Sequence, residues 1–238
     1  SSPTDRRPKF HLYQPSIALI SGIAWDHINV FPTFENYVEQ FEIFIDKITP
    51  GGTLVYFSDD KTLSRIVRNS SNTIKKIPYK TPTYSIENNE TLLDTPDGMM
   101  PLEVFGEHNL QNLEGARWIC QLMGVNEIDF YEAIASFSGA SKRMEKIFEN
   151  PDTVVYKDFA HSPSKVDATT QAVKSQYEDR KLIACLELHT YSSLTPEFLE
   201  EYKGSLDAAD VAIVFYSPDA FEIKGLEPID KEQILSSF

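Results

Sequence analysis

Hydrophobic and polar positions in the first quarter of the chain follow two periods in turn. Ser16 to Ile23 is a short apolar run rich in aliphatic residues and predicts a buried strand. From Phe34 to Ile48 the apolar residues recur at helical spacing, and Pro50-Gly51-Gly52 ends this predicted helix. Thr53 to Phe57 then predicts a second buried strand.

Between residues 73 and 105 the long apolar runs and helical periodicity give way to several short segments. They are separated by turn-forming residues, namely Pro78, Pro82, Asn88-Asn89 and Pro96-Asp97-Gly98. Such spacing predicts a small antiparallel meander. Helical periodicity returns from Asn109 to Met123 and again from Glu127 to Phe137, which predicts a helical hairpin closed by residues 138–141.

Strands and helices alternate again after this break. The pattern predicts strands at 153–156, 182–188 and 211–216, and helices at 164–177 and 196–206. Because alternating strands and helices form parallel sheets, we expect a second, Rossmann-like α/β domain. The expected domains are residues 1–140 and residues 141–238. The chain stops just after a helical pattern at 231–235, so we expect the second domain to be incomplete.

Composition places the chain among ordinary globular proteins. Hydrophobic residues make up 41% of it and charged residues 24%. No apolar stretch approaches the roughly 20 residues that cross a bilayer, and the start resembles no secretory signal, so no membrane is expected as a partner. The formal net charge of -14 disfavours a nucleic-acid partner. The sequence does not predict an oligomeric state.

Two polar clusters in the expected first domain are candidates for chemistry. Asp26 and His27 follow the first predicted strand, and an imidazole beside a carboxylate is a common way to hold a divalent ion. A structural histidine is the alternative. His108 and Asn112 are four residues apart at the start of a predicted helix, where one face could contact an adenine, although Asn109 could simply cap that helix.

The expected second domain offers three further candidates. Arg143 follows the break between domains and could grip a phosphate, unless it is only a solvated surface residue. The run Asp158 to Pro163, which includes His161, lies between a strand and a helix. The run Glu187 to Ser192, which includes His189 and Tyr191, ends the next strand. Ligands collect at such strand ends, although a capped turn is the alternative for the first run. A Gly-Lys-Ser/Thr phosphate-binding loop is absent from the sequence.

The order and spacing of four of these segments resemble the Mur ligase family. Trp25-Asp26-His27 looks like the family's Asp-His element, whose His ligates Mg²⁺. Gly106 to Asn112 resembles its G-x-H-N-x-x-N signature, whose His and second Asn lie against adenine. Arg143 resembles the arginine that contacts phosphate, and Asp158 to Pro163 resembles the D-[YF]-A-H-x-P signature, whose Asp is associated with the ribose.

The resemblance implies an ATP-dependent amide ligase of peptidoglycan synthesis or recycling in the cytoplasm. Mg²⁺ and ATP would be its cofactors, and UDP-N-acetylmuramate would be joined through an acyl phosphate to a tripeptide or to L-alanine. Residues 1–140 would be the C-terminal part of the ATP-binding central domain, and residues 141–238 the C-terminal ligase domain. The implied roles are catalysis by Arg143 and His27, metal ligation by His27, nucleotide binding by His108, Asn109, Asn112, Arg143, Asp158 and His161, and substrate binding by Glu187, His189 and Tyr191.

Within the family, the incoming substrate is predicted from short segments only. Asp26 to Phe31 and Arg6 to Phe10 look most like the members that attach a recycled tripeptide. Leu186 to Ser192 looks closer to the members that add L-alanine. We favour the tripeptide on this evidence and keep L-alanine as the alternative.

Departures from the family pattern lead to further expectations. Gly22 and Ala24 stand where the family usually has an Asn and an acidic or polar residue. The N-terminal domain, phosphate-binding loop and acidic metal ligand would precede Ser1, so we expect a piece of a longer protein that is inactive by itself. A nucleotide- or peptide-binding paralogue without catalysis is the competing hypothesis.

Overall fold

A computed structural model describes Asp5 and residues 7–238. The expected resemblance of Arg6 to Phe10 therefore begins outside the described residues. The chain divides into two compact units. The first unit comprises Ser1–Pro82 and Asn109–Ile134, and the second comprises Thr83–His108 and Ala135–Phe238.

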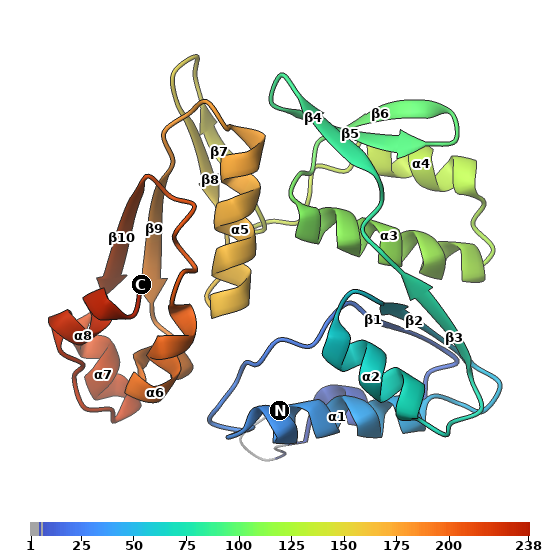
Figure 1. Cartoon of the computed structure of the whole chain (residues 1–238), viewed down its shortest axis with the longest axis horizontal. Coiled ribbons are helices and arrows are strands. Elements are labelled where there is room, and N and C mark those ends of the chain that lie inside the picture. The colour runs from blue at the N-terminus through green and yellow to red at the C-terminus, as the bar shows by residue number, and fades with distance from the viewer. Residues whose placement is uncertain (1–4, 6) are drawn as a thin grey trace. The chain divides into compact units, whose positions relative to one another are not determined.

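A three-stranded parallel sheet forms the centre of the first unit (Figure 1). The strands lie in the order β1-β2-β3, where β1 is Ile17–Ile20, β2 is Thr53–Phe57 and β3 is Lys75–Tyr79. The helices of this unit are α1 (Phe34–Lys47), α2 (Lys61–Asn69), most of α3 (Glu107–Leu122) and most of α4 (Glu127–Ala135), and the 3₁₀ helix η1 is Lys9–Leu12.

Both faces of this sheet are covered by helices. Ala18 and Ile20 pack with the buried residues of α1 and α2. Leu19 and Val55 pack instead with Trp118 of α3. Because neighbouring residues of a strand point to opposite faces, the apolar run of β1 is explained by burial on both sides. The predicted first strand, first helix and second strand are confirmed.

Asp60 fixes the segment that leaves β1. Its Oδ1 accepts a hydrogen bond of 2.8 Å from the backbone N–H of Leu63 and so caps α2. Its Oδ2 accepts one of 2.6 Å from the backbone N–H of Ile23. A single carboxylate thus connects the start of α2 to the chain that continues towards Asp26 and His27.

One expectation for this unit was wrong. Residues 75–79 were expected in the antiparallel meander, but they form β3, which pairs in parallel with β2. Pro78 lies within β3 and lacks the N–H that a further strand would need, and β3 is the edge of the described ladder. Pro78 therefore does not break the strand as the sequence pattern predicts, because an edge strand tolerates proline.

Tyr79 brings a buried hydroxyl into the first unit. Its side chain is 3% exposed, and among the described residues its hydroxyl has no hydrogen-bond partner. Burial, and next the negative charge of Glu114, raise the pKa of Tyr79 to about 12. The protonated form is therefore favoured by folding.

Replacing Tyr79 by phenylalanine should leave stability at pH 7 unchanged or raise it by about 1 kcal/mol, because an unpaired buried hydroxyl is removed. In the native sequence, the stability from the raised pKa is complete below the ordinary tyrosine pKa of 10.0 and is lost as pH rises towards about 12. Urea unfolding at several pH values should show this decline, and Tyr79→Phe should flatten it. An equally steep decline in the variant would contradict the prediction.

The second unit begins with the meander that the sequence predicts (Figure 1). Its antiparallel strands are β4 (Tyr84–Glu87), β5 (Glu90–Thr95) and β6 (Gly98–Leu102). Asn88 and Asn89 join the first two strands with φ angles of 51° and 63°. Asparagine tolerates this left-handed conformation, which a two-residue hairpin of the primed type requires.

The remainder of the second unit is a mixed α/β arrangement. The strands β7 (Glu145–Glu149) and β8 (Val154–Lys157) form an antiparallel pair, whereas β9 (Ile183–Leu188) and β10 (Val211–Tyr216) pair in parallel as expected. The helices are α5 (Pro163–Gln176), α6 (Pro196–Leu199), α7 (Pro218–Lys224) and α8 (Lys231–Ser236), with the 3₁₀ helices η2 (Ser192–Leu194) and η3 (Glu200–Tyr202).

The meander belongs to the same compact unit as these later elements. The hydroxyl of Thr91 in β5 donates a buried hydrogen bond of 2.8 Å to the side-chain oxygen of Gln176 in α5. Phe105, Met144 and Ala172 form a shared apolar cluster. The expected domain boundary after residue 140 stays a prediction, since the nearest point where the chain passes between units lies between Ile134 and Ala135. In the described part of the chain, no helix is long and apolar enough to span a membrane.

Candidate functional site

Gly106 brings the start of α3 against α5 in the second unit. Its φ is +89°, a conformation that residues with a side chain rarely adopt. A Cβ built on it would lie 2.5 Å from the Cβ of Ala172 and 3.3 Å from Nδ1 of His108. The glycine of the G-x-H-N-x-x-N pattern is therefore required by its backbone conformation and by the close approach of Ala172.

His108 is held in its uncharged form by its surroundings. Burial lowers the pKa of the imidazole, and the nearby charges of Asp158 and Glu107 only partly oppose this effect. Its Nδ1 is buried, and among the described residues it has no hydrogen-bond partner. A neutral imidazole with an unpaired buried nitrogen can exchange a hydrogen bond with a bound ligand.

Asp158 connects the end of β8 to the segment that precedes β7. Its Oδ2 accepts a hydrogen bond of 2.7 Å from the backbone N–H of Met144, and its Oδ1 accepts one of 2.5 Å from that of Ala160. Lys142 and Met144 both have positive φ angles, of 59° and 51°. The carboxylate therefore helps to hold a strained segment that includes Arg143.

Replacing Asp158 by alanine should lower the free energy of unfolding by about 2 kcal/mol, because two backbone N–H groups lose a charged acceptor. Asp158→Asn should lose about half as much, since one amide oxygen can still accept one of the two bonds. Guanidinium unfolding of the three proteins would measure the order. Equal stability of Asp158→Ala and the native chain would contradict this structural role.

A row of aromatic contacts connects three of the predicted site residues. The guanidinium carbon of Arg143 lies 5.3 Å from the ring centroid of Phe159. The ring of Phe159 is 4.9 Å from that of His161, and the ring of His161 is 6.0 Å from that of His189. The structure thus brings Arg143, His161 and His189 into one row on the second unit.

Phe159 is the member of this row that was not singled out from the sequence. An exposed phenylalanine between a strand and a helix is an unspecific signal, because it also occurs as ordinary surface. Tyr202 was also missed, although its hydroxyl donates a hydrogen bond to the carbonyl oxygen of His161. The hydrogen bond from Tyr202 joins residues far apart in the sequence, and the contacts of Phe159 depend on the orientation of its ring. Neither property can be predicted from the local sequence pattern.

The end of β9 places the predicted substrate residues on the surface. Glu187, His189 and Tyr191 are exposed. The imidazole Nδ1 of His189 lies 3.2 Å from the carbonyl oxygen of Glu187. The loop is stiffened next to them, since the hydroxyl of Ser193 accepts hydrogen bonds from the backbone N–H and the hydroxyl of Thr190.

The remaining candidates, His27, Asn109 and Asn112, belong to the first unit. His27 is exposed, has a φ of 59°, and its backbone N–H donates to Asp26 over 2.7 Å. It lies beyond the end of β1 at Ile20 rather than in a strand. His108, Asn109 and Asn112 all lie in α3, as predicted.

The described residues contain no cluster of three or more His, Cys, Asp or Glu side chains that could hold a metal ion. His27 alone does not make a Mg²⁺ site, because Mg²⁺ prefers several oxygen ligands in octahedral geometry. Its role as a metal ligand stays a prediction.

The sequence matches a known family model, the Mur ligase middle domain, over residues 4–119. It is 30% identical to the UDP-N-acetylmuramate–L-alanine ligase of Caldicellulosiruptor bescii, over 86% of this chain and 47% of that protein. It is 31% identical to the enzyme of the same name from Arthrobacter sp. strain FB24, over 85% of this chain and 45% of that protein. The chain thus spans about half the length of these curated relatives.

Solved structures show the same fold. UDP-N-acetylmuramate-alanine ligase from Thermotoga maritima aligns with a TM-score of 0.65 and 19% identity, over 98% of this chain and 52% of its own. A murein peptide ligase from Psychrobacter arcticus aligns with a TM-score of 0.62 and 21% identity, over 100% of this chain and 50% of its own. The fold is the α/β fold of Mur ligases, with a middle domain and a Rossmann-like C-terminal part. This chain belongs to the Mur ligase family.

Proposed function

We propose that the complete protein containing this chain is an ATP-dependent amide ligase that acts on UDP-N-acetylmuramate. The proposal rests on family membership together with the buried, unpartnered imidazole nitrogen of His108. Gly106 permits the close approach, His108 keeps an unpaired buried nitrogen, and Asp158 lies close enough to affect its pKa. Localisation in the cytoplasm is part of this proposal.

The residues around His108 fit a nucleotide. A neutral imidazole can accept a hydrogen bond from an exocyclic amine such as that of adenine. The Asp158 carboxylate already accepts two backbone N–H bonds, and its oxygens keep further lone pairs that can accept ribose hydroxyls. Asn109 and Asn112, in the same helix as His108, are proposed to complete the nucleotide contacts.

ATP would supply the phosphoryl group that activates the muramoyl carboxylate, so that an incoming amine displaces phosphate and forms the amide. Arg143 is proposed to stabilise the phosphate charge. The contact with Phe159 restrains its guanidinium, which lowers the entropy lost when a phosphate binds. His161 and His189 continue the row towards Glu187 and Tyr191, which are proposed to line the site of the incoming amine.

The described residues do not assemble a Mg²⁺ site, so no step is assigned to a metal in this chain. The proposed contribution of His27 is ligation together with groups from other parts of the complete protein. Exchange of His27 for glutamine should then raise the Mg²⁺ concentration needed for half-maximal activity, because one ligand is lost, without affecting folding, since the side chain is exposed.

L-Alanine is the first candidate for the incoming substrate. The two curated relatives described above carry L-alanine ligase names and match most of this chain. The tripeptide favoured from short sequence segments is the second candidate, and the murein peptide ligase whose structure aligns over the whole chain supports it.

Ligation by the complete protein tests the proposal. It would be supplied with ATP, Mg²⁺ and UDP-N-acetylmuramate, and with L-alanine or L-Ala-γ-D-Glu-meso-diaminopimelate in separate reactions. Amide formation with one substrate would identify it. Absence of turnover with both would favour a binding paralogue without catalysis, and amide formation by the isolated 238-residue chain would contradict its expected inactivity.

Arg143 can be tested against a neighbouring cation. Arg143→Ala should reduce turnover by a factor of about 100 or more, whereas Lys142→Ala, which removes an adjacent positive charge, should change it less than about threefold. Arg143→Lys should recover only part of the loss, because lysine lacks the planar fork of donors. Equal effects of Arg143→Ala and Lys142→Ala would contradict the assignment.

A further inference from the structure

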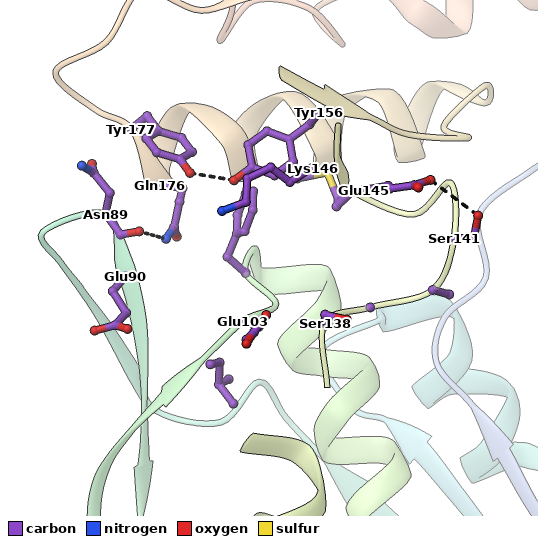
Figure 2. A pocket seen from close by; sticks show the side chains of 15 residues that line it. Asn89, Glu90, Glu103, Ser138, Ser141, Glu145, Lys146, Tyr156, Gln176 and Tyr177 are labelled. Atoms are coloured by element: carbon purple, nitrogen blue, oxygen red, sulfur yellow. Dashed lines mark hydrogen bonds between the residues drawn. The ribbon is translucent and has the colours of Figure 1, made fainter. Parts of the chain in front are cut away.

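The second unit contains a pocket of about 670 Å³ outside the row of predicted site residues (Figure 2). Its volume lies in the ordinary range for small-molecule sites. The pocket is bounded by the meander, the segment 138–141, the start of β7, and the end of α5. All of these elements belong to the second unit.

Aromatic rings form one wall of this pocket. Phe105 and Tyr156 contact each other edge to face with ring centroids 5.2 Å apart, and Tyr177 lies 6.3 Å from Phe105. The hydroxyls of Tyr156 and Tyr177 share a hydrogen bond of 2.6 Å (Figure 2). Burial, and next that hydrogen bond, raise the pKa of Tyr156, so its hydroxyl stays uncharged at neutral pH.

The wall is held in place before any ligand arrives. Gln176 is buried, and its side-chain N–H donates a hydrogen bond of 2.6 Å to the carbonyl oxygen of Asn89. Its side-chain oxygen accepts the bond from Thr91, which is fully buried. Because both ends of the amide are occupied, α5 and the meander hairpin are fixed to each other, and little ordering remains for a ligand to impose.

Negative charge dominates the polar part of the lining. Glu90, Glu103 and Glu145 line the pocket with a single cation, Lys146. Lys146 already forms an ion pair with Glu149, which lies outside the lining, at 2.7 Å. Figure 2 shows Glu90 and Glu103 on the meander side, opposite Lys146 and Tyr156, while Glu145 points away towards Ser141.

Acidic groups and aromatic rings line the same preformed pocket, and together they favour a particular class of ligand. Carboxylates bind ammonium groups, and tyrosine and phenylalanine faces attract cations and cover methylene chains. A bare metal ion would leave the apolar wall unused, and an anion would be repelled by the carboxylates.

We propose that this pocket binds a small organic cation of the alkyl diamine class, with ammonium groups at Glu90 and Glu103 and methylenes against Phe105, Tyr156 and Tyr177. None of the residues assigned to the proposed nucleotide and amine sites lines this pocket, and the proposal does not depend on the proposed function. Since both carboxylates are exposed, binding weakens as salt concentration rises.

Calorimetric titration of the 238-residue chain with pentane-1,5-diamine tests the proposal. Pentane-1,5-diol is the matched uncharged probe. Saturable one-to-one binding is expected for the diamine and absent for the diol. The double variant Glu90→Gln/Glu103→Gln should weaken diamine binding about tenfold or more, because two charge-assisted contacts are lost. Lys146→Met should strengthen it, because a competing cation is removed.

Glu222→Gln is the control for general surface charge. Glu222 lies in α7, is exposed and does not line the pocket. Its exchange should alter diamine affinity less than about twofold. Thermal unfolding followed by circular dichroism would verify that each variant is folded.

Any of three calorimetric results would overturn the proposal: equal binding of diol and diamine, an equal loss in Glu222→Gln and in the double variant, or displacement of the diamine by equimolar Mg²⁺. Chemical shift changes at the ring protons of Tyr156 and Tyr177 should accompany binding. Changes confined to residues outside the pocket lining would overturn it as well.

Discussion

Replacing Gly106 by alanine is expected to destabilise the second unit by about 3 kcal/mol, from left-handed backbone strain and overpacking together. The φ of +89° disfavours a side chain, and the new Cβ would lie 2.5 Å from the Cβ of Ala172. Ala172 is itself buried in α5, so the contact cannot be relieved by a flexible side chain. Guanidinium unfolding would measure the loss.

Gly204→Ala separates the two causes. Gly204 also lies in the second unit and has a φ of +81°, but the nearest atom to a built Cβ is Oδ2 of Asp207 at an ordinary 3.4 Å. This variant should lose only the roughly 1 kcal/mol that backbone strain costs. A loss in Gly106→Ala no larger than that in Gly204→Ala would show that the close approach to Ala172 has no energetic weight.

Gly106→Ala should also change ligand binding. The same Cβ would lie 3.3 Å from Nδ1 of His108 and so displace the imidazole. If His108 contacts a nucleotide as proposed, affinity for ADP should fall in Gly106→Ala and remain near the native value in Gly204→Ala. Measuring both affinities on folded protein below the unfolding transition separates this effect from stability.

Arg117→Met is expected to destabilise the first unit by about 3 kcal/mol, because it leaves a nearly buried carboxylate without its partner. The guanidinium of Arg117 donates two hydrogen bonds to Glu114, of 2.8 and 2.5 Å. The side chains are only 16% and 12% exposed. Arg117 also donates to Glu127 over 2.9 Å and so connects α3 to the start of α4.

Two further variants test the origin of this effect. Glu114→Met/Arg117→Met removes both charges and should recover most of the stability lost in Arg117→Met, because no buried charge then lacks a partner. Glu127→Gln should cost less than about 1 kcal/mol, since Glu127 is 40% exposed. A double variant less stable than Arg117→Met would contradict this account.

Glu114 also connects the ion pair to Tyr79. Because its charge contributes to the raised pKa of that tyrosine, Glu114→Gln should lower the pH at which the Tyr79 phenol ionises. The Tyr79 pKa should fall in this variant whether or not the Glu114–Arg117 ion pair stabilises the fold. The measurement therefore reports how close Glu114 lies to Tyr79, and it complements the unfolding data.

The local sequence pattern predicted those elements whose structure depends mainly on their own residues. Thr53 to Phe57 is a strand within the bounds predicted, and the first helix was predicted within one residue of Phe34–Lys47. Asn88-Asn89 forms the predicted turn because asparagine tolerates positive φ. The helix α2, with polar residues between its apolar ones, and β7 were not predicted.

The candidate site was predictable in its residue types and not in its contacts. The pattern around Gly106 predicted a ligand-binding helix start, but the need for glycine there follows from Ala172, which lies in a different helix. Asp158 was expected to meet a ribose, and its bond to the N–H of Met144 was not foreseen. Hydrogen bonds between segments depend on a register that periodicity does not contain.

The α/β class, most strands and helices, and the family to which the chain belongs could be predicted from the amino-acid sequence alone. These properties follow from local periodicity, turn residues and motif spacing. Three features emerge only when distant segments pack together: β3 joins the parallel sheet, the meander belongs with the C-terminal elements, and Glu90 and Glu103 line the same pocket as three aromatic rings. Such choices are made by pairing and burial between distant segments, which each segment's own pattern leaves open.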